Sequence, residues 1–147
     1  MSAIRRAETQ WSGPLATGSG TVSAKSSGAF SDLPVSWAAR TEESNGKTSP
    51  EELLAAAHAA CFSMALSGAL ARAGTPPDDL DVSAEVTFDK LDAGWRVVSS
   101  HLTVRGRVPG ISEADFLTAA EGTRDGCPIS QALMGNVALS VDASLVA

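Results

Sequence analysis

Cysteine is scarce in this sequence: only Cys61 and Cys127 occur among 147 residues. The first residues, Met1 to Trp11, lack the apolar run of a signal peptide. Two cysteines in such a chain indicate a reducing compartment, so we expect a cytoplasmic protein. There a cysteine pair is more often redox-active or metal-binding than a permanent disulfide.

Basic residues are also in deficit, with 11 Lys and Arg against 17 Asp and Glu and a formal net charge of -6. This balance argues against nucleic acid or an anionic membrane as a partner. The candidate metal ligands have no paired spacing, which argues against zinc: Cys61, Cys127, His58 and His101. No internal repeat or low-complexity segment occurs, and the length predicts one domain, 1–147, that buries about 70% of its unfolded surface.

The chain is organised around a predicted helix from Ser49 to Gly74. Ser49 suits the N-cap, Pro50 the first helical position and Glu52 the third, which together make a capping box. Gly74, followed by Thr-Pro-Pro, is a stop signal. Apolar residues occupy nearly every face between these caps, so we expect protein to surround the helix, with a homodimer burying the face that one small sheet leaves open.

The apolar stretch from Leu53 to Leu70 is about long enough to span a bilayer. It is rich in alanine and carries His58, Ser63 and Ser67, and the other segments are amphipathic. We therefore expect a buried core helix and no membrane span.

The remaining segments predict strands before the helix, then a hairpin, a second helix and a closing strand. The second helix begins at the cap Ser112 and reaches about Arg124, and Pro128 starts a short helix through Leu133. Because strands and helices segregate along the chain, we predict an α+β fold with a mainly antiparallel sheet. The predicted strands are Ala3–Trp11, Ser19–Ala24, Val35–Arg40, Leu80–Phe88, Trp95–Val108 and Asn136–Val146.

The two cysteines occupy different local positions. Cys61 lies three turns inside the long helix, whereas Cys127 precedes Pro128 at a helix start that stabilises a thiolate. A helix end contributes about 0.3–1 kcal/mol, but a guanidinium at about 4 Å contributes roughly 4 kcal/mol at an effective dielectric of 20. The deciding question is therefore which arginine approaches Cys61.

Several motifs together carry a resemblance that covers nearly the whole chain. They are Thr48-Ser-Pro-Glu-Glu-Leu-Leu-Ala-Ala-Ala-His-Ala-Ala-Cys-Phe-Ser-Met-Ala-Leu-Ser67, Gly126-Cys-Pro-Ile-Ser130, Trp11-x-Gly13, Gly18-x-Gly20 and Asp92-Ala-Gly94. In these motifs the sequence closely resembles the OsmC/Ohr family of thiol peroxidases. His58 and the Asp-Ala-Gly turn are more similar to the osmotically inducible OsmC branch than to the organic-hydroperoxide-resistance Ohr branch. Ser49 stands where the family often has Asn, which keeps the capping chemistry.

The resemblance implies a function and a site. Cys61 would be the peroxidatic cysteine and Cys127 the resolving one, with Arg40 and Glu51 flanking the thiolate and no metal or organic cofactor. The fold would wrap antiparallel sheets around long central helices in an intertwined homodimer. The substrates would be organic hydroperoxides in preference to hydrogen peroxide. The reductant would be a dithiol, for which a lipoyl-bearing protein is the candidate carrier. Arg5, Arg6 and Arg96 rival Arg40 on composition alone.

Helix geometry adds a hypothesis about the dimer. Glu51 and Cys61 are ten residues apart on one helix, about 15 Å along its axis. If Glu51 serves Cys61, it must come from the helix of the partner, so the active site would be composite.

Other functions stay open at this point. One alternative is a non-catalytic dimeric dithiol protein that senses oxidation or binds a small apolar molecule. His58 lies three residues before Cys61, on the same helical face, as in a Cys/His acyl hydrolase, although a histidine satisfied in the core is the simpler reading. Inert buried cysteines and a structural Cys61–Cys127 disulfide are the remaining alternatives.

Overall fold

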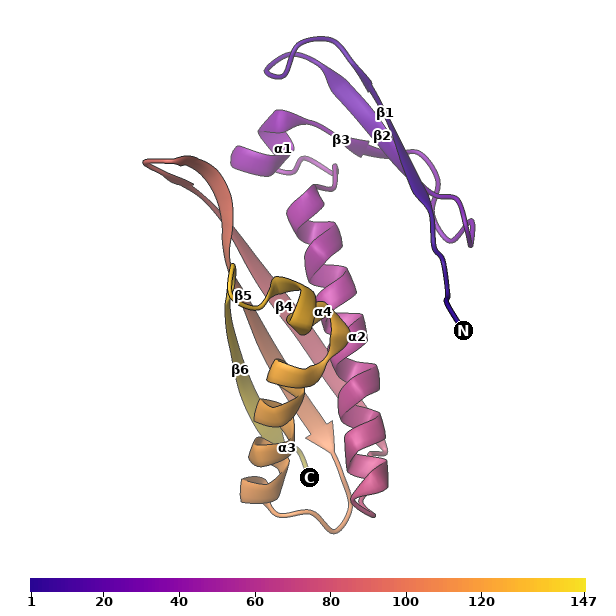
Figure 1. Ribbon diagram of the computed structural model, residues 1–147, viewed down its shortest axis with the longest axis vertical. Coiled ribbons are helices and arrows are strands. Elements are labelled where there is room, and N and C mark those ends of the chain that lie inside the picture. Colours follow the sequence, from indigo (N-terminus) through magenta and orange to yellow (C-terminus); the bar gives the residue numbers. More distant parts are fainter. The chain divides into compact units, whose positions relative to one another are not determined.

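The computed structural model describes all residues from 1 to 147 (Figure 1). Contacts gather into two compact units, residues 1–53 and residues 54–147, while one domain over 1–147 stays a prediction. The elements in chain order are β1 (Ala7–Ser12), β2 (Ser19–Ala24), β3 (Leu33–Val35), α1 (Trp37–Thr41), α2 (Pro50–Arg72), β4 (Asp79–Leu91), β5 (Gly94–Arg107), α3 (Glu113–Gly126), α4 (Pro128–Leu133) and β6 (Ala138–Leu145).

The first unit holds a three-stranded antiparallel sheet in the order β1-β2-β3. Gly20 permits the close approach of β1, because a Cβ there would lie 2.6 Å from the carbonyl oxygen of Gln10. The predicted strand over Val35–Arg40 is wrong beyond Val35. Ser36 accepts a hydrogen bond from the backbone N–H of Ala39 and caps the short helix α1 instead.

Helix α2 begins and ends where its capping residues predict. The Ser49 hydroxyl accepts from the Glu52 backbone N–H at 3.1 Å, and Gly74 takes the positive φ of 87° that ends the helix. The capping box is incomplete, because the Glu52 carboxylate accepts from the Thr48 hydroxyl rather than from the Ser49 backbone.

One stripe of α2 is fully buried within the chain. Its residues are spaced four positions apart and are His58, Phe62, Leu66 and Leu70. Met64 on another face is 71% exposed. The helix is long and apolar enough to cross a membrane, although core helices of soluble proteins meet the same criteria. The expected burial on all faces is therefore not achieved by one chain alone.

The second unit holds a sheet in the order β4-β5-β6. Strands β4 and β5 form the predicted hairpin, in which Gly94 adopts a φ of 119° after the Asp92–Ala93 turn. Strand β6 runs parallel to β5, because α3 and α4 carry the chain back across the sheet between them. The sheets are thus mainly antiparallel, with one parallel closing strand.

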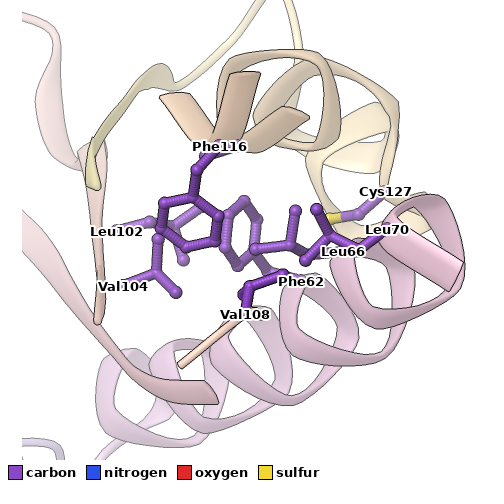
Figure 2. Close-up of a cluster of buried hydrophobic side chains, with 9 residues drawn as sticks. Phe62, Leu66, Leu70, Leu102, Val104, Val108, Phe116 and Cys127 are labelled. Atoms are coloured by element: carbon purple, nitrogen blue, oxygen red, sulfur yellow. The ribbon is translucent and has the colours of Figure 1, made fainter. Parts of the chain in front are cut away.

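The core of the second unit lies between the sheet and the helices (Figure 2). Phe62, Leu66 and Leu70 from α2 meet Leu102 and Val104 from β5. Phe116 from α3 completes the layer above Gly106, where a Cβ would lie 2.7 Å from its ring. Burying each such side chain contributes about 1.5–3 kcal/mol, so α2 is held firmly against this sheet.

Candidate active site

Cys61 lies in the middle of α2, one residue before the fully buried Phe62. Its side chain is partly exposed and packs against the hydrophobic core that contains Cys127. The position is set by the helix, whose rigid turns fix the direction of the sulfur.

Cys127 lies at the junction of two helices and is 1% exposed. Its backbone N–H donates to the Thr123 carbonyl at 2.9 Å and ends α3. Its Sγ accepts from the Ser130 backbone N–H at 3.4 Å and caps α4, whose first residue is Pro128. A pocket of about 340 Å³ reaches this cysteine between α2 and α3.

Both cysteines are free thiols, and Cys127 is one of the groups that shift the pKa of Cys61. Burial is the largest effect on Cys61 and raises its pKa above the usual value. A backbone hydrogen bond with Ile129 lowers the pKa, whereas the charge of Cys127 and a hydrogen bond with it raise the pKa. Within residues 54–147 no arginine takes part, so this unit alone does not supply the expected guanidinium beside Cys61.

The second group of predicted residues lies in the first unit. Arg40, near the end of α1, pairs with Glu51 in the first turn of α2. The Arg40 Nε donates to both carboxylate oxygens at 3.1 Å, and Nη2 donates to Oε1 at 2.7 Å. Glu51 is 7% exposed, and the guanidinium also lies 5.7 Å from the centre of the Trp37 ring. The carboxylate therefore fixes the direction of the guanidinium.

Arg40 lines a pocket of about 370 Å³ whose other walls are largely apolar. They include two tryptophans, Trp11 and Trp37, together with Thr9, Leu15, Val35, Ser36 and Pro50. The pocket thus combines one cation with an apolar surface that suits a small organic group.

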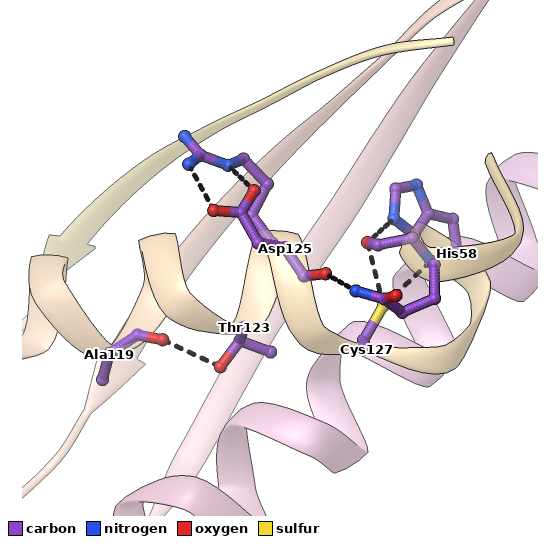
Figure 3. Close-up of polar contacts among 8 residues, drawn as sticks. His58, Ala119, Thr123, Asp125 and Cys127 are labelled. Atoms are coloured by element: carbon purple, nitrogen blue, oxygen red, sulfur yellow. Dashed lines mark hydrogen bonds and ion pairs between the residues drawn. The ribbon is translucent and has the colours of Figure 1, made fainter. Parts of the chain in front are cut away.

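His58 connects to Cys127 through a buried chain of hydrogen bonds (Figure 3). Its Nδ1 lies 2.7 Å from the Ser100 Oγ of β5, and its Nε2 lies 2.8 Å from the Ser130 Oγ of α4. The Ser130 Oγ lies 3.0 Å from the Cys127 Sγ. Burial lowers the pKa of His58, so the ring is neutral near pH 7.

The sequence analysis assigned no role to Ser100 or Ser130, the two serines in this chain of hydrogen bonds. Ser130 follows Cys127 by three residues, a capping spacing that identifies it from sequence. Ser100 carries no such signal, because its place opposite His58 depends on the register of β5. Both ring nitrogens of His58 are occupied by serines, so the pairing of a Cys/His hydrolase with Cys61 is not formed.

The zinc alternative has no cluster of ligands. No three His, Cys, Asp or Glu side chains lie together in a way that would hold a metal ion. His101 lies away from the cysteines on β5, where it contacts Ser140 and Asp142 of β6.

A family match and two similar proteins agree on the family to which this chain is similar. The family described as OsmC-like protein matches residues 42–142. "Peroxiredoxin OsmC" of Escherichia coli is 40% identical over 139 residues, which cover 95% of this chain and 96% of that protein. An "organic hydroperoxide resistance protein" of Xanthomonas axonopodis is 31% identical over 91 residues, covering 61% of this chain and 62% of that protein.

Solved structures agree at the level of the fold. The organic hydroperoxide resistance protein OhrB of Bacillus subtilis superposes with a TM-score of 0.71 at 24% identity, covering 96% of this chain and 98% of that one. An OsmC-like protein of Mycoplasma pneumoniae gives a TM-score of 0.75 at 16% identity, with both chains fully covered. The predicted α+β fold of this type is therefore confirmed.

Proposed function

The chain belongs to the OsmC-like protein family, and from this premise we propose that it is a thiol peroxidase that reduces organic hydroperoxides, and hydrogen peroxide more weakly. The observation that carries the proposal is the pair of free cysteines: Cys127 lies in the core against which Cys61 packs, and it shifts the pKa of Cys61. The names of the relatives point to the same chemistry. We place the cycle in the cytoplasm, where dithiol reductants are available.

In the first step, the Cys61 thiolate attacks one oxygen of the peroxide bond. The O–O bond breaks, Cys61 becomes a sulfenic acid, and the departing alkoxide takes a proton to leave as an alcohol. The Cys61 sulfur supplies both electrons for this step, so the step as written uses no metal or organic cofactor.

The first step needs a positive charge beside Cys61, because burial raises the pKa of its thiol. We assign this role to Arg40, which would stabilise the thiolate and the negative charge on the departing oxygen. A guanidinium at about 4 Å contributes roughly 4 kcal/mol at an effective dielectric of 20, up to about three pKa units before desolvation. Glu51 would hold Arg40 in place through the bidentate pair.

A homodimer would bring these groups together. Helix α2 exposes apolar residues such as Met64 in a single chain, and a second copy would cover them. Glu51 and Cys61 lie about 15 Å apart along one helix. The Arg40–Glu51 pair of one protomer would therefore serve Cys61 of its partner.

In the second step, Cys127 attacks the sulfenic acid of Cys61. The new S–S bond forms as the S–O bond breaks, and the oxygen leaves as water. An external dithiol, for which a lipoyl-bearing protein is the candidate carrier, then exchanges with the disulfide and restores both thiols.

The apolar pocket at Arg40 supports an organic substrate. Its tryptophans would contact the organic group of a hydroperoxide, whereas hydrogen peroxide has no group to fill the space. Binding energy gained there is available only to the bulkier substrate.

Steady-state turnover tests the proposal. Purified protein should reduce cumene hydroperoxide faster than hydrogen peroxide with a dithiol as reductant, and Cys61→Ser should abolish turnover. Oxidation that stops after one equivalent would instead indicate a dithiol sensor. Hydrolysis of activated esters that is unaffected by Cys127→Ser would indicate an acyl hydrolase.

A subunit-mixing experiment tests the composite site separately. Neither Cys61→Ser nor Glu51→Ala homodimers should turn over at the wild-type rate. Mixed dimers would contain one intact site, so activity should rise above that of either variant. A mixture no more active than the separate variants would show that the groups act within one chain.

A further inference from the structure

The second step of the proposed cycle requires the Cys127 thiol to lose its proton inside the protein. Cys127 is 1% exposed, so water does not surround its sulfur. Its nearest oxygen partner is the Ser130 hydroxyl, 3.0 Å away, which itself lies 2.8 Å from the His58 Nε2. Both Ser130 and His58 are fully buried.

We propose that Ser130 and His58 form a proton path for Cys127. Ser130 is the catalytic residue of this path, because its hydroxyl contacts the reacting sulfur. His58 acts through Ser130 as a positioning residue and proton acceptor. This inference rests on the proposed function in one respect: there, a hydroperoxide is the oxidant that modifies Cys61.

The hydrogen-bond directions make the path possible. A neutral imidazole carries one hydrogen, and placing it on Nδ1 directs it at Ser100 and leaves Nε2 free to accept from the Ser130 hydroxyl. The Ser130 oxygen then accepts from the Cys127 S–H. Burial lowers the pKa of His58 and keeps this acceptor state populated near neutral pH.

The step balances as follows. As the Cys127 sulfur attacks Cys61, its proton moves to the Ser130 oxygen and the Ser130 hydroxyl proton moves to the His58 Nε2. The S–O bond of the sulfenic acid breaks, and the proton returns through Ser130 to the departing hydroxide, which leaves as water. The sulfenic acid is the oxidant, so no further electron acceptor is needed.

The charged and titratable groups near this path come from three elements. Cys61 on α2 interacts with Cys127, and β5 contributes Ser100, whereas the neighbouring His101 contacts Ser140 and Asp142 of β6. On α3 the charges of Arg124 and Asp125 are paired with each other. Apart from that ion pair, the groups near the path with a shifted pKa are Cys61 and His58.

The core arrangement also fits a purely structural histidine, so the test must separate proton transfer from packing. Cys61 of the reduced protein is first converted to its mixed disulfide with an aromatic disulfide reagent (5,5′-dithiobis-(2-nitrobenzoate)). Attack by Cys127 then releases a second equivalent of the coloured thiolate. This rate measures the second step without any hydroperoxide.

We expect Ser130→Ala and His58→Gln to slow this release about tenfold or more at pH 7. The slowing should shrink to within about threefold near pH 9.5, because the higher concentration of hydroxide then removes the thiol proton without the Ser130–His58 path. Ser130→Thr keeps the hydroxyl and should restore most of the rate. Thr123→Val is the matched control, because it removes a buried hydroxyl that bonds only the Ala119 carbonyl.

Three results would overturn the path: equal slowing at both pH values, no slowing in Ser130→Ala, or slowing of the same size in Thr123→Val. If the variants fail to fold, a measurement on the wild-type protein tests the proton path. Its release rate should fall about twofold in heavy water at matched pH, and an unchanged rate would contradict proton transfer. If Cys127 releases the coloured thiolate as expected but the protein does not turn over hydroperoxide, the peroxidase proposal is refuted and the proton path is not.

Discussion

Replacing Arg40 by glutamine tests whether Glu51 acts by holding the guanidinium. The change removes the three hydrogen bonds from Arg40 to the carboxylate and leaves Glu51, which is 7% exposed, without its cation. Glutamine keeps a polar side chain but is shorter than arginine, so the contact of the guanidinium with the Trp37 ring is lost as well.

The size of the effect follows from the geometry. Unit charges 2.7 Å apart interact by about 6 kcal/mol at an effective dielectric of 20. Desolvation of Glu51 and partial exposure of Arg40, 30% at its side chain, reduce this value. We expect a coupling free energy of about 1.5–3 kcal/mol, above the range of about 0–1 kcal/mol for surface pairs.

A double-mutant cycle measures this coupling. Wild type, Arg40→Gln, Glu51→Gln and the double variant are unfolded in urea at one protein concentration, because a dimer makes stability concentration-dependent. The same four proteins are assayed for kcat/KM with cumene hydroperoxide. If Glu51 acts only through Arg40, the double variant should be no less active than Arg40→Gln.

Two results would refute the reasoning. A coupling below about 0.5 kcal/mol would show that the pair behaves as an ordinary surface contact. Losses of kcat/KM that add in the double variant would show that Glu51 acts independently of Arg40.

Three further predictions concern the second unit. Cys127→Ser should leave the first oxidation intact but let Cys61 proceed to sulfinic acid. Mass spectrometry would detect this as a gain of two oxygens. A stable sulfenic acid would argue against resolution by Cys127. Phe62→Ala should lower the free energy of unfolding by about 3–5 kcal/mol in urea, because Phe62 is 0% exposed; a loss under 1 kcal/mol would contradict the core described above. The free energy of unfolding should also fall as pH drops below about 6.5, because burial lowers the pKa of folded His58 and the unfolded chain then binds more protons. His58→Gln should make the free energy of unfolding less dependent on pH in this range.

Local signals made the helices predictable from sequence. Ser49 and Ser112 cap α2 and α3 through hydrogen bonds to residues only three positions away. Pro128 starts α4 for the same kind of local reason. Local chemistry of this kind survives in the folded protein because it does not depend on distant partners.

Features set by distant partners were not predictable. The direction of β6 depends on how α3 and α4 cross the sheet, so alternation of apolar residues gave its position but not its parallel pairing. Ser100 meets His58 only because of strand register. The roles of Arg40 and Glu51 came from family resemblance, since their spacing of eleven residues predicts no contact.

Non-reducing peptide mapping after one equivalent of cumene hydroperoxide tests the central claim most directly. The account predicts loss of both free thiols and one disulfide joining the peptides of Cys61 and Cys127 within a chain, with cumyl alcohol released in equal amount. Consumption of the hydroperoxide with both thiols still free, or a disulfide that joins two chains through Cys61 alone, would contradict it.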